Sequence, residues 1–240
     1  MEAAHYWYGD TWVDPPTPGS TTLWQGGYYA GIVLDGQQGN KQYHLVRAPR
    51  VSGGLQGFYG GTSPTFVRWG PNQCDYPSAS VRRDDYGGTA TALLVNSSAH
   101  NAFYWFRASN GPNGGTFNLS TGGQGGGTGI GGYNDWYMPT RDEAKMCFRA
   151  FKHNSGTVNN YTITYASPQT TNVTQNPNSL FQTGGSESFS HYNNWFLTAR
   201  EAENNCSARG ITMGNGNYTN PYYKSDTNWY LFAVRRVAVP

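Results

Sequence analysis

The segment 131–143 constrains the fold of this chain most tightly, because an aromatic run ends at Pro139 and a helix-start pattern follows at once. Thr140 is a residue type that caps helices, and Glu143 follows three positions later, as in a capping box. In that motif the hydroxyl and the carboxylate bind free backbone amides at the helix start. The sequence therefore predicts a helix that begins directly after Thr140.

One face of this helix is apolar. Its apolar residues recur at the spacing of a helical face, and they are Ala144, Cys147, Phe148 and Phe151. The polar remainder is Arg141, Asp142, Lys145, Arg149 and Lys152. We interpret the apolar stripe as core packing, with Cys147 as a small buried hydrophobe, since a buried apolar face is the usual source of helix stability.

Composition indicates one domain rich in turns and aromatic rings. A chain of 240 residues can bury a core without metal or disulfide staples. It contains 32 Gly and 13 Pro, 15% of its residues are aromatic and only 12% are charged, about half the usual charged share. So many rings argue against disorder. We expect a single domain over residues 21–240, preceded by an arm over residues 1–20.

The arm ends in a proline-rich segment, residues 14–19. We expect this segment to be extended and to stay out of a central strand, because proline lacks the backbone N–H. Four aromatic residues precede it: Tyr6, Trp7, Tyr8 and Trp12. They are expected to pack either on the arm's own domain or on a neighbouring chain.

Charge and cysteine content exclude several classes of partner and site. The formal net charge is +2 and no Lys/Arg block concentrates it, so we expect no nucleic-acid partner. No stretch approaches the roughly 20 apolar residues of a membrane span. The three cysteines form no CxxC pair, which argues against a disulfide framework and a zinc knuckle. Whether Cys74 and Cys206 pair stays open.

Strand patterns open the domain. A strand with a Gly bulge is predicted at 23–34, a hairpin turn at 35–40 and a returning strand at 43–48. Further strand candidates are 65–69, 161–165, 194–198 and 207–213. Helix-length apolar patterns cover 89–95 and 98–106, although their Thr and aromatic content leaves strand as an alternative. The polar stretches 110–132 and 154–194 are predicted to be loops. A loop as long as the second is typical of a binding surface or of contact with another chain.

The last strand candidate, residues 229–239, is apolar on both faces and is expected to be central in its sheet. One of Arg235 and Arg236 must then face inward, and an unpaired buried guanidinium is too costly to persist. The carboxylates predicted to pair with it lie near the start of the helix: Asp135, Asp142 and Glu143.

Three stretches match motifs of one known family. Gly132-Tyr-Asn-Asp-Trp-Tyr-Met-Pro-Thr-Arg-Asp-Glu143 is similar to its Asp-Trp-Tyr-Leu-Pro-Ser/Thr-x-x-Glu-Leu signature, and Ala233-Val-Arg-Arg-Val237 to its Val-Arg-x-Val-Arg-Arg ending. Gly26-Gly-Tyr-Tyr-Ala-Gly-Ile-Val33 with His44-Leu-Val-Arg-Ala-Pro49 resembles its opening hairpin. The matches keep the family's order over about residues 22–239. The family is that of the C-type-lectin-like domains at the end of a bacterial collagen-like adhesin and in many phage tail-fibre and virion proteins.

The resemblance implies an α+β fold of the C-type-lectin type: mixed and β-rich, with a few short helices and long Gly/Asn-rich loops that form a ligand-facing variable surface. The chain departs from the family around Trp195, where the acidic residue, Glu201, lies further along. The residues that carry the structural signature are Asp135, Trp136, Pro139, Thr140, Glu143, Arg235 and Arg236.

The resemblance leads us to expect a non-enzymatic virion protein, a tail fibre, spike or decoration, that attaches to a host surface or glycan. Tyr and Trp offer rigid contact area, Asn and Ser offer adaptable hydrogen bonds, and sugar rings stack on aromatic side chains. The candidate ligand-binding residues are Tyr161, Tyr165, Tyr192, Trp195, Tyr218, Tyr222 and Tyr223. Expected partners are other virion proteins, a host cell-surface glycan or protein, and further copies of the chain in a homo-oligomer.

Two alternatives stay open. The chain is a purely structural virion subunit that cements neighbours, or it is an adhesin domain on a bacterial cell surface rather than on a virion. The proline-containing arm favours the first alternative.

Catalysis is not expected. The five histidines are isolated and form no zinc motif, and no Gly-x-Ser-x-Gly nucleophile elbow occurs. The adjacent carboxylates Asp84 and Asp85 could serve a glycosidase, but in a loop they are more often a solvated turn or a calcium ligand. We therefore expect no catalytic residue, no metal site and no cofactor, with calcium as the one open alternative.

Overall fold

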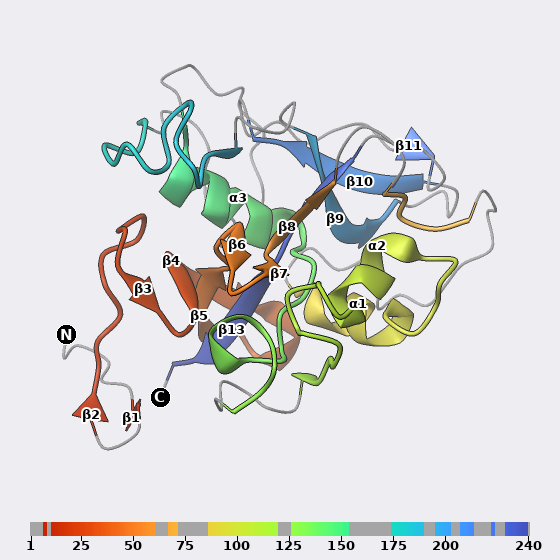
Figure 1. Cartoon of the computed structure of the whole chain (residues 1–240), viewed down its shortest axis with the longest axis horizontal. Coiled ribbons are helices and arrows are strands. Elements are labelled where there is room, and N and C mark those ends of the chain that lie inside the picture. The colour runs from red at the N-terminus through yellow and green to blue at the C-terminus, as the bar shows by residue number, and fades with distance from the viewer. Residues whose placement is uncertain are drawn as a thin grey trace.

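Two β-sheets and one long helix, α3, form the body of the chain (Figure 1). The computed structural model describes residues 7–8, 11–60, 67–71, 86–119, 126–153, 174–189, 195–202, 207–213, 222–223 and 229–239. Over these residues the fold is mixed α+β, rich in strands and with a few short helices, which confirms the expected fold class at that level. The strand predicted at 161–165 lies outside the described residues.

The first sheet is antiparallel and has the order β13-β5-β4-β3. Its strands are β3 (Leu23–Trp24), β4 (Gly27–Asp35), β5 (Lys41–Arg47) and β13 (Val234–Ala238). The prediction of one strand over 23–34 is wrong at Gln25 and Gly26, whose φ angles of 52° and 83° turn the chain between β3 and β4. The predicted bulge is confirmed between Tyr29 and Gly31, and the turn at 35–40 contains the 3₁₀-helix η1 (Gly36–Gln38).

The second sheet has the order β11-β10-β9-β12-β8. Its strands are β8 (Phe58–Gly60), β9 (Trp195–Glu201), β10 (Ser207–Thr212), β11 (Tyr222–Tyr223) and β12 (Tyr230–Phe232). Strands β9 and β12 are parallel, and the other neighbours are antiparallel. The strands predicted near 194–198 and 207–213 are thus confirmed, whereas Val67, Arg68 and Trp69 of the 65–69 candidate are not in a strand.

Two small hairpins accompany these sheets: β1 (Trp7–Tyr8) with β2 (Thr11–Trp12), and β6 (Val51–Ser52) with β7 (Leu55–Gln56). Figure 1 shows β1 and β2 at the lower left, beyond β3. From there the arm returns to the body at Gly19, whose N–H donates to the carbonyl of Tyr29.

The closing segment does not form one strand. It divides at Ala233, so that β12 lies inside the second sheet between β9 and β8, while β13 is an edge strand of the first. The N–H of Ala233 donates to the carbonyl of Gly57, and the carbonyl of Ala233 accepts from the N–H of Ala48. The pairing of β12 in the second sheet thus ends where that of β13 in the first sheet begins. The expected central position is therefore right for β12 and wrong for β13, whose far side carries a single bridge, from Tyr137 to Val234, among the described residues.

The helices are short except for α3. They are α1 (Gly88–Leu94), α2 (Asn101–Tyr104), η3 (Trp105–Arg107), η5 (Ile130–Gly132) and α3 (Arg141–Phe151). Helix α3 begins after Thr140 with a capping box to Glu143, as predicted. The helical patterns near 89–95 and 98–106 are likewise confirmed. Among the described residues, none of the helices has the length and apolar character needed to cross a membrane.

Helix α3 packs its apolar stripe under both sheets. Ala144, Cys147, Phe148 and Phe151 are fully buried, as predicted. Lys145 and Lys152, assigned to the polar face, are buried as well. Long aliphatic stems can cover apolar surface in this way, and the Lys152 ammonium lies 5.7 Å from the centre of the Phe148 ring. Burial, with the nearby charge of Arg141, lowers the pKa of Lys145 to about 8.

Two aromatic cores flank the sheets. One lies beside α1 and α2 and includes Trp69, Phe103, Trp105 and Trp136. The other lies beneath α3 and includes Phe148, Phe151, Phe181, Phe189, Phe196 and Phe232. Rings are thus the main packing units in a chain with few charged residues.

Candidate functional site

Both arginines of the closing strand are buried, although the sequence required only one to face inward. Successive residues of a strand point to opposite faces, and here each face meets its own carboxylate. Arg235 donates from Nε to Asp135 Oδ1 at 2.7 Å and from Nη2 to Oδ2 at 3.0 Å. Its guanidinium carbon lies 3.7 Å from the centre of the Tyr133 ring. The predicted pairing with Asp135 is confirmed.

Arg236 binds on the opposite face. Its Nε donates to Glu143 Oε1 at 2.8 Å, and its Nη1 donates to Asp35 Oδ2 at 3.3 Å. Burial alone lowers the pKa of Arg236, but the carboxylates of Glu143 and Asp35 outweigh that effect and raise it above its ordinary value. Glu143 was one of the three predicted partners. Asp142 is not a partner, since it is half-buried and pairs with Arg141.

Glu143 joins this pair to the rest of the helix start. Its carboxylate accepts hydrogen bonds from the Tyr137 hydroxyl at 2.6 Å, from Gly87 N–H at 3.1 Å and from Thr140 N–H at 2.9 Å. The signature residues Trp136 and Pro139 are also buried here. We call this set, Asp35, Asp135, Glu143, Arg235 and Arg236, the arginine clamp.

A small hollow opens beside the clamp. Its volume is about 190 Å³ and Tyr43, Tyr86 and Tyr137 contribute three phenol rings to it, so we call it the tyrosine hollow. The full lining is Asp35, Gln38, Tyr43, Tyr86, Leu119, Asp135, Tyr137, Arg236 and Ala238. Burial raises the pKa of Tyr86 and Tyr137, so both phenols stay protonated at neutral pH. The hollow therefore presents hydroxyl, carboxylate, amide and guanidinium groups together.

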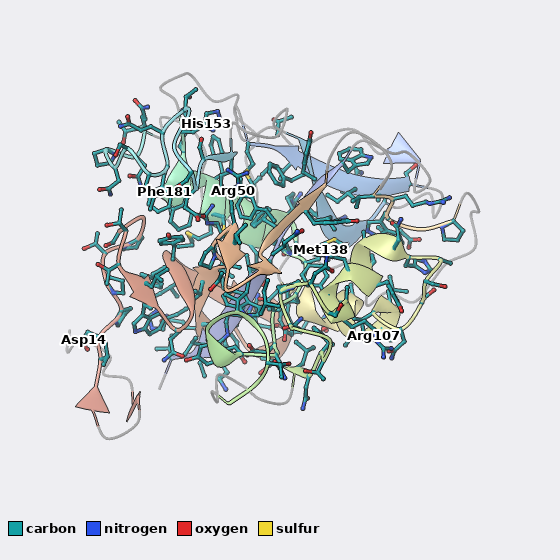
Figure 2. All side chains as sticks on the ribbon, in the orientation of Figure 1. Asp14, Arg50, Arg107, Met138, His153 and Phe181 are labelled. Carbon is teal, nitrogen blue, oxygen red and sulfur yellow. The ribbon has the colours of Figure 1, made fainter. Side chains whose placement is uncertain are left out.

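A second, larger hollow of about 460 Å³ lies next to the first, and Leu119 lines both. Its lining is Ala92, Val95, Asn96, Arg107, Gly115, Thr116, Phe117, Asn118 and Leu119, and we call it the Arg107 hollow. Arg107 donates to the side-chain oxygen of Asn96 and lies 6.0 Å from the Tyr104 ring centre. Figure 2 shows Arg107 at the outer margin of the molecule, beside α1 and α2.

A third buried guanidinium, that of Arg47, was not foreseen. Five aromatic rings surround it at 4.7 to 5.4 Å: Tyr28, Phe58, Phe151, Phe181 and Phe189. Its Nη2 donates to Glu187 Oε2 at 3.0 Å, which fixes the segment 174–189 to β5. Burial lowers the pKa of Arg47, and the Glu187 carboxylate opposes that change. We interpret this pair as structural, because rings enclose it.

The strand directions place one predicted binding residue, Trp195, at one end of the second sheet. Gly60, Tyr230, Phe196 and Ile211 form a row across four strands at that end. The segments 61–66, 190–194, 214–221 and 224–228 each join a strand there. Trp195, the first residue of β9, lies one position beyond the row. Tyr192 and Tyr218 belong to joined segments, but they and Tyr161 and Tyr165 lie outside the described residues.

Tyr222 and Tyr223 lie elsewhere on the same sheet. They pair with Ala208 and Ser207, whereas Trp195 pairs with Thr212. Ala208 and Thr212 are four positions apart in β10, or roughly 13 Å along the strand. The structure therefore does not bring Tyr222 and Tyr223 together with Trp195.

Apart from Asp135 and Arg236, sequence reasoning missed the residues of the two hollows. Asp35 and Gln38 carried only a turn signal, and the segment 115–119 only a loop signal. The pairing of Tyr43 with Ala238 is what carries the hairpin turn to the closing strand. That long-range register leaves no local pattern in the sequence.

Among the described residues, His, Cys, Asp and Glu side chains form no group of three or more suited to a metal ion. His44 shares a 2.7 Å hydrogen bond with the Tyr29 hydroxyl, and His100 one of 2.9 Å with Ser97. Cys147 is a buried free thiol, and burial raises its pKa. Asp84, Asp85, Cys74 and Cys206 lie outside the described residues.

Comparison with known proteins gives no match: no family model, no curated protein and no solved structure is similar to this chain at a significant level.

Proposed function

We propose that this chain is a non-enzymatic component of a phage virion, a tail fibre, spike or decoration, whose C-type-lectin-like module attaches to a host-surface glycan. The proposal joins the resemblance of three sequence stretches to the arrangement of the residues in them.

The arginine clamp is the observation that carries the proposal. The three similar stretches are far apart in the chain, yet residues in or next to each of them contact one another. Asp35 ends the opening hairpin's first strand, Asp135 and Glu143 belong to the central stretch, and Arg236 belongs to the ending. Ion pairs join the closing strand to both other parts. A shared fold accounts for three motifs that depend on one another in this way.

Attachment is assigned to the end of the second sheet where four segments join its strands. Those segments are rich in Asn, Ser and Thr, and two of them contribute Tyr192 and Tyr218. Such residues suit recognition, because aromatic rings stack on sugars and short polar side chains adapt their hydrogen bonds.

A glycan array and an adsorption assay test the proposal. The purified protein should bind at least one bacterial surface glycan and, in excess, should reduce the adsorption of the phage that carries it. The variant Trp195→Ala should weaken both effects, while Val51→Ala, a change at an exposed position in the β6–β7 hairpin, should leave them intact. Absence of binding in both assays would remove the recognition function.

The purely structural alternative is favoured by the arm. Its β1–β2 hairpin has only two residues per strand and pairs with none of the other described strands, and an isolated hairpin is marginally stable in water. A neighbouring subunit would give it a surface to pack on. If that is its role, deleting residues 1–12 should abolish oligomers in sedimentation analysis and leave glycan binding by the monomer unchanged. A truncated protein that assembles normally would exclude this alternative.

A further inference from the structure

We propose that the tyrosine hollow and the Arg107 hollow together bind an acidic oligosaccharide, with its carboxylate-bearing unit at Arg107 and a neutral sugar ring in the tyrosine hollow. This inference deepens the proposed glycan attachment and rests on it, but it assigns the ligand to a different surface from the end of the second sheet.

Size limits what each hollow can hold. The tyrosine hollow, at about 190 Å³, is below the range of roughly 300–1,000 Å³ that is usual for drug-sized ligands. It suits one small polar unit. The Arg107 hollow, at about 460 Å³, falls within that range. Because Leu119 lines both hollows, one ligand of at least two linked units can occupy them across that side chain.

The chemistry of the tyrosine hollow matches a neutral sugar ring. Hydroxyl groups of a sugar both donate and accept, and the lining includes the exposed Gln38 amide beside the buried clamp residues Asp35 and Arg236. The carboxylates of Asp35 and Asp135 disfavour an anionic group here. The rings of Tyr43 and Tyr86 also line the hollow, and the Arg236 guanidinium carbon lies 5.1 and 4.3 Å from their centres.

The Arg107 hollow has the opposite electrostatic character. Within the described part of the chain, Arg107 is the one charged residue of its lining, which includes no carboxylate. The amides of Asn96 and Asn118 and the hydroxyl of Thr116 surround an exposed guanidinium with further hydrogen-bonding groups, while Phe117 adds a ring. A guanidinium forms strong, directional hydrogen bonds with a carboxylate. The contrast between the hollows therefore sets the direction of the ligand.

Other ligand classes fit less well. A nucleic acid would place repeated phosphates against Asp35 and Asp135, where like charges repel. A peptide held by strand addition needs an open backbone edge, and among the described residues none that lines the Arg107 hollow belongs to a strand. An acidic saccharide satisfies both linings.

Titration with a glucuronate–galactose disaccharide and its carboxyl-reduced counterpart tests the assignment, with binding followed by saturation-transfer NMR. The wild-type protein should bind the acidic disaccharide at least about tenfold more tightly, since a charge-assisted hydrogen bond contributes that much. Arg107→Gln should remove this preference. Gln38→Ala should weaken both probes by several-fold. Arg149→Gln, an exposed arginine of α3 that lines neither hollow, is the matched control and should change nothing.

The outcomes separate this inference from the proposed function. Equal affinity for the two disaccharides, or binding unaffected by both Arg107→Gln and Gln38→Ala, overturns the site while glycan attachment through Trp195 still stands. Absence of binding to any glycan overturns both. Loss of the acidic preference in Arg107→Gln alone, with an unchanged circular dichroism spectrum, supports the site.

Discussion

Two neighbouring arginines are buried in one strand because each meets a carboxylate on its own face. Desolvating a guanidinium is costly, and the cost is offset only where a partner and further hydrogen bonds are fixed in place. Arg235 has Asp135 and the Gln25 carbonyl, and Arg236 has Glu143 and Asp35. These side chains therefore specify how the closing strand is seated.

Replacing Arg236 by Met should destabilise the protein by about 3–5 kcal/mol, because Glu143 and Asp35 would remain buried without their cation. Urea unfolding monitored by tryptophan fluorescence measures the change. The control Arg149→Met, at an exposed position, should stay within about 0.5 kcal/mol. Equal stability of the two variants would show that the clamp is not needed.

Acid should destabilise the fold in part through His44. Burial lowers the pKa of His44 to about 4 from its ordinary value of 6.5, so the unfolded chain binds this proton first as the pH falls. Its contribution is fully present above pH 6.5 and is lost between pH 6.5 and about 4. The urea midpoint should therefore drop over that window.

The variant His44→Gln, which keeps a partner for the Tyr29 hydroxyl, should show a shallower drop over the same window. Some dependence should remain, because burial also lowers the pKa of His153. A pH profile identical to that of the wild type would exclude His44 as a contributor.

At the residue scale, the sequence predicted that the closing-strand arginines pair with carboxylates near the helix start. It did not predict the surroundings of Arg47 or the role of Asp35. The need for a buried partner follows from Arg235 and Arg236 lying in an apolar strand, and two of the three carboxylates named are the ones used. Arg47 gave no such signal, since Glu187 lies 140 positions away and its ring cage is assembled from segments far apart in the chain. Asp35 was hidden for the same reason.

Among the elements, helix α3 and the opening hairpin follow from local patterns, and the closing strand does not. Its apolar residues fit one long strand or two short ones equally well. Backbone pairing of Ala233 with Ala48 and Gly57 decides the matter, and both partners come from the first quarter of the chain. The predicted loop stretches could be located, but their positions relative to the sheets depend on such long-range pairing.

Alanine substitution at two glycines with the same left-handed backbone distinguishes the cost of backbone strain from the cost of lost packing. Gly39 has φ 65° and open space around the position that a Cβ would occupy, whereas a Cβ on Gly131, φ 64°, would lie 2.3 Å from the Gly26 Cα. Gly39→Ala should cost about 1 kcal/mol, the effect of left-handed geometry alone. Gly131→Ala should cost clearly more, because η5 would be pushed off the turn at Gly26.

Thermal unfolding of the two variants beside the wild type measures both effects. Equal shifts of the melting temperature would mean that the contact between η5 and the β3–β4 turn contributes nothing.

At the scale of the whole molecule, the same elements connect the two sheets and their aromatic cores. Helix α3 packs on both sheets, and β12 continues into β13 from one sheet to the other. We therefore expect one cooperative unfolding transition, with calorimetric and van't Hoff enthalpies that agree. Two resolved transitions by calorimetry would show that the cores belong to separate domains.

The passage of the chain at Ala233 from the second sheet to the first also has a consequence for folding during synthesis. Neither sheet is complete until residues 229–239 have been added, since these supply an inner strand to one sheet and the edge strand beside β5 to the other. A ribosome-bound chain that lacks them exposes the ring-rich interior of both halves at once. Folding of this protein is thus completed only after β12 and β13 have been synthesised. A nascent chain halted shortly before them should be a target for chaperones and proteases.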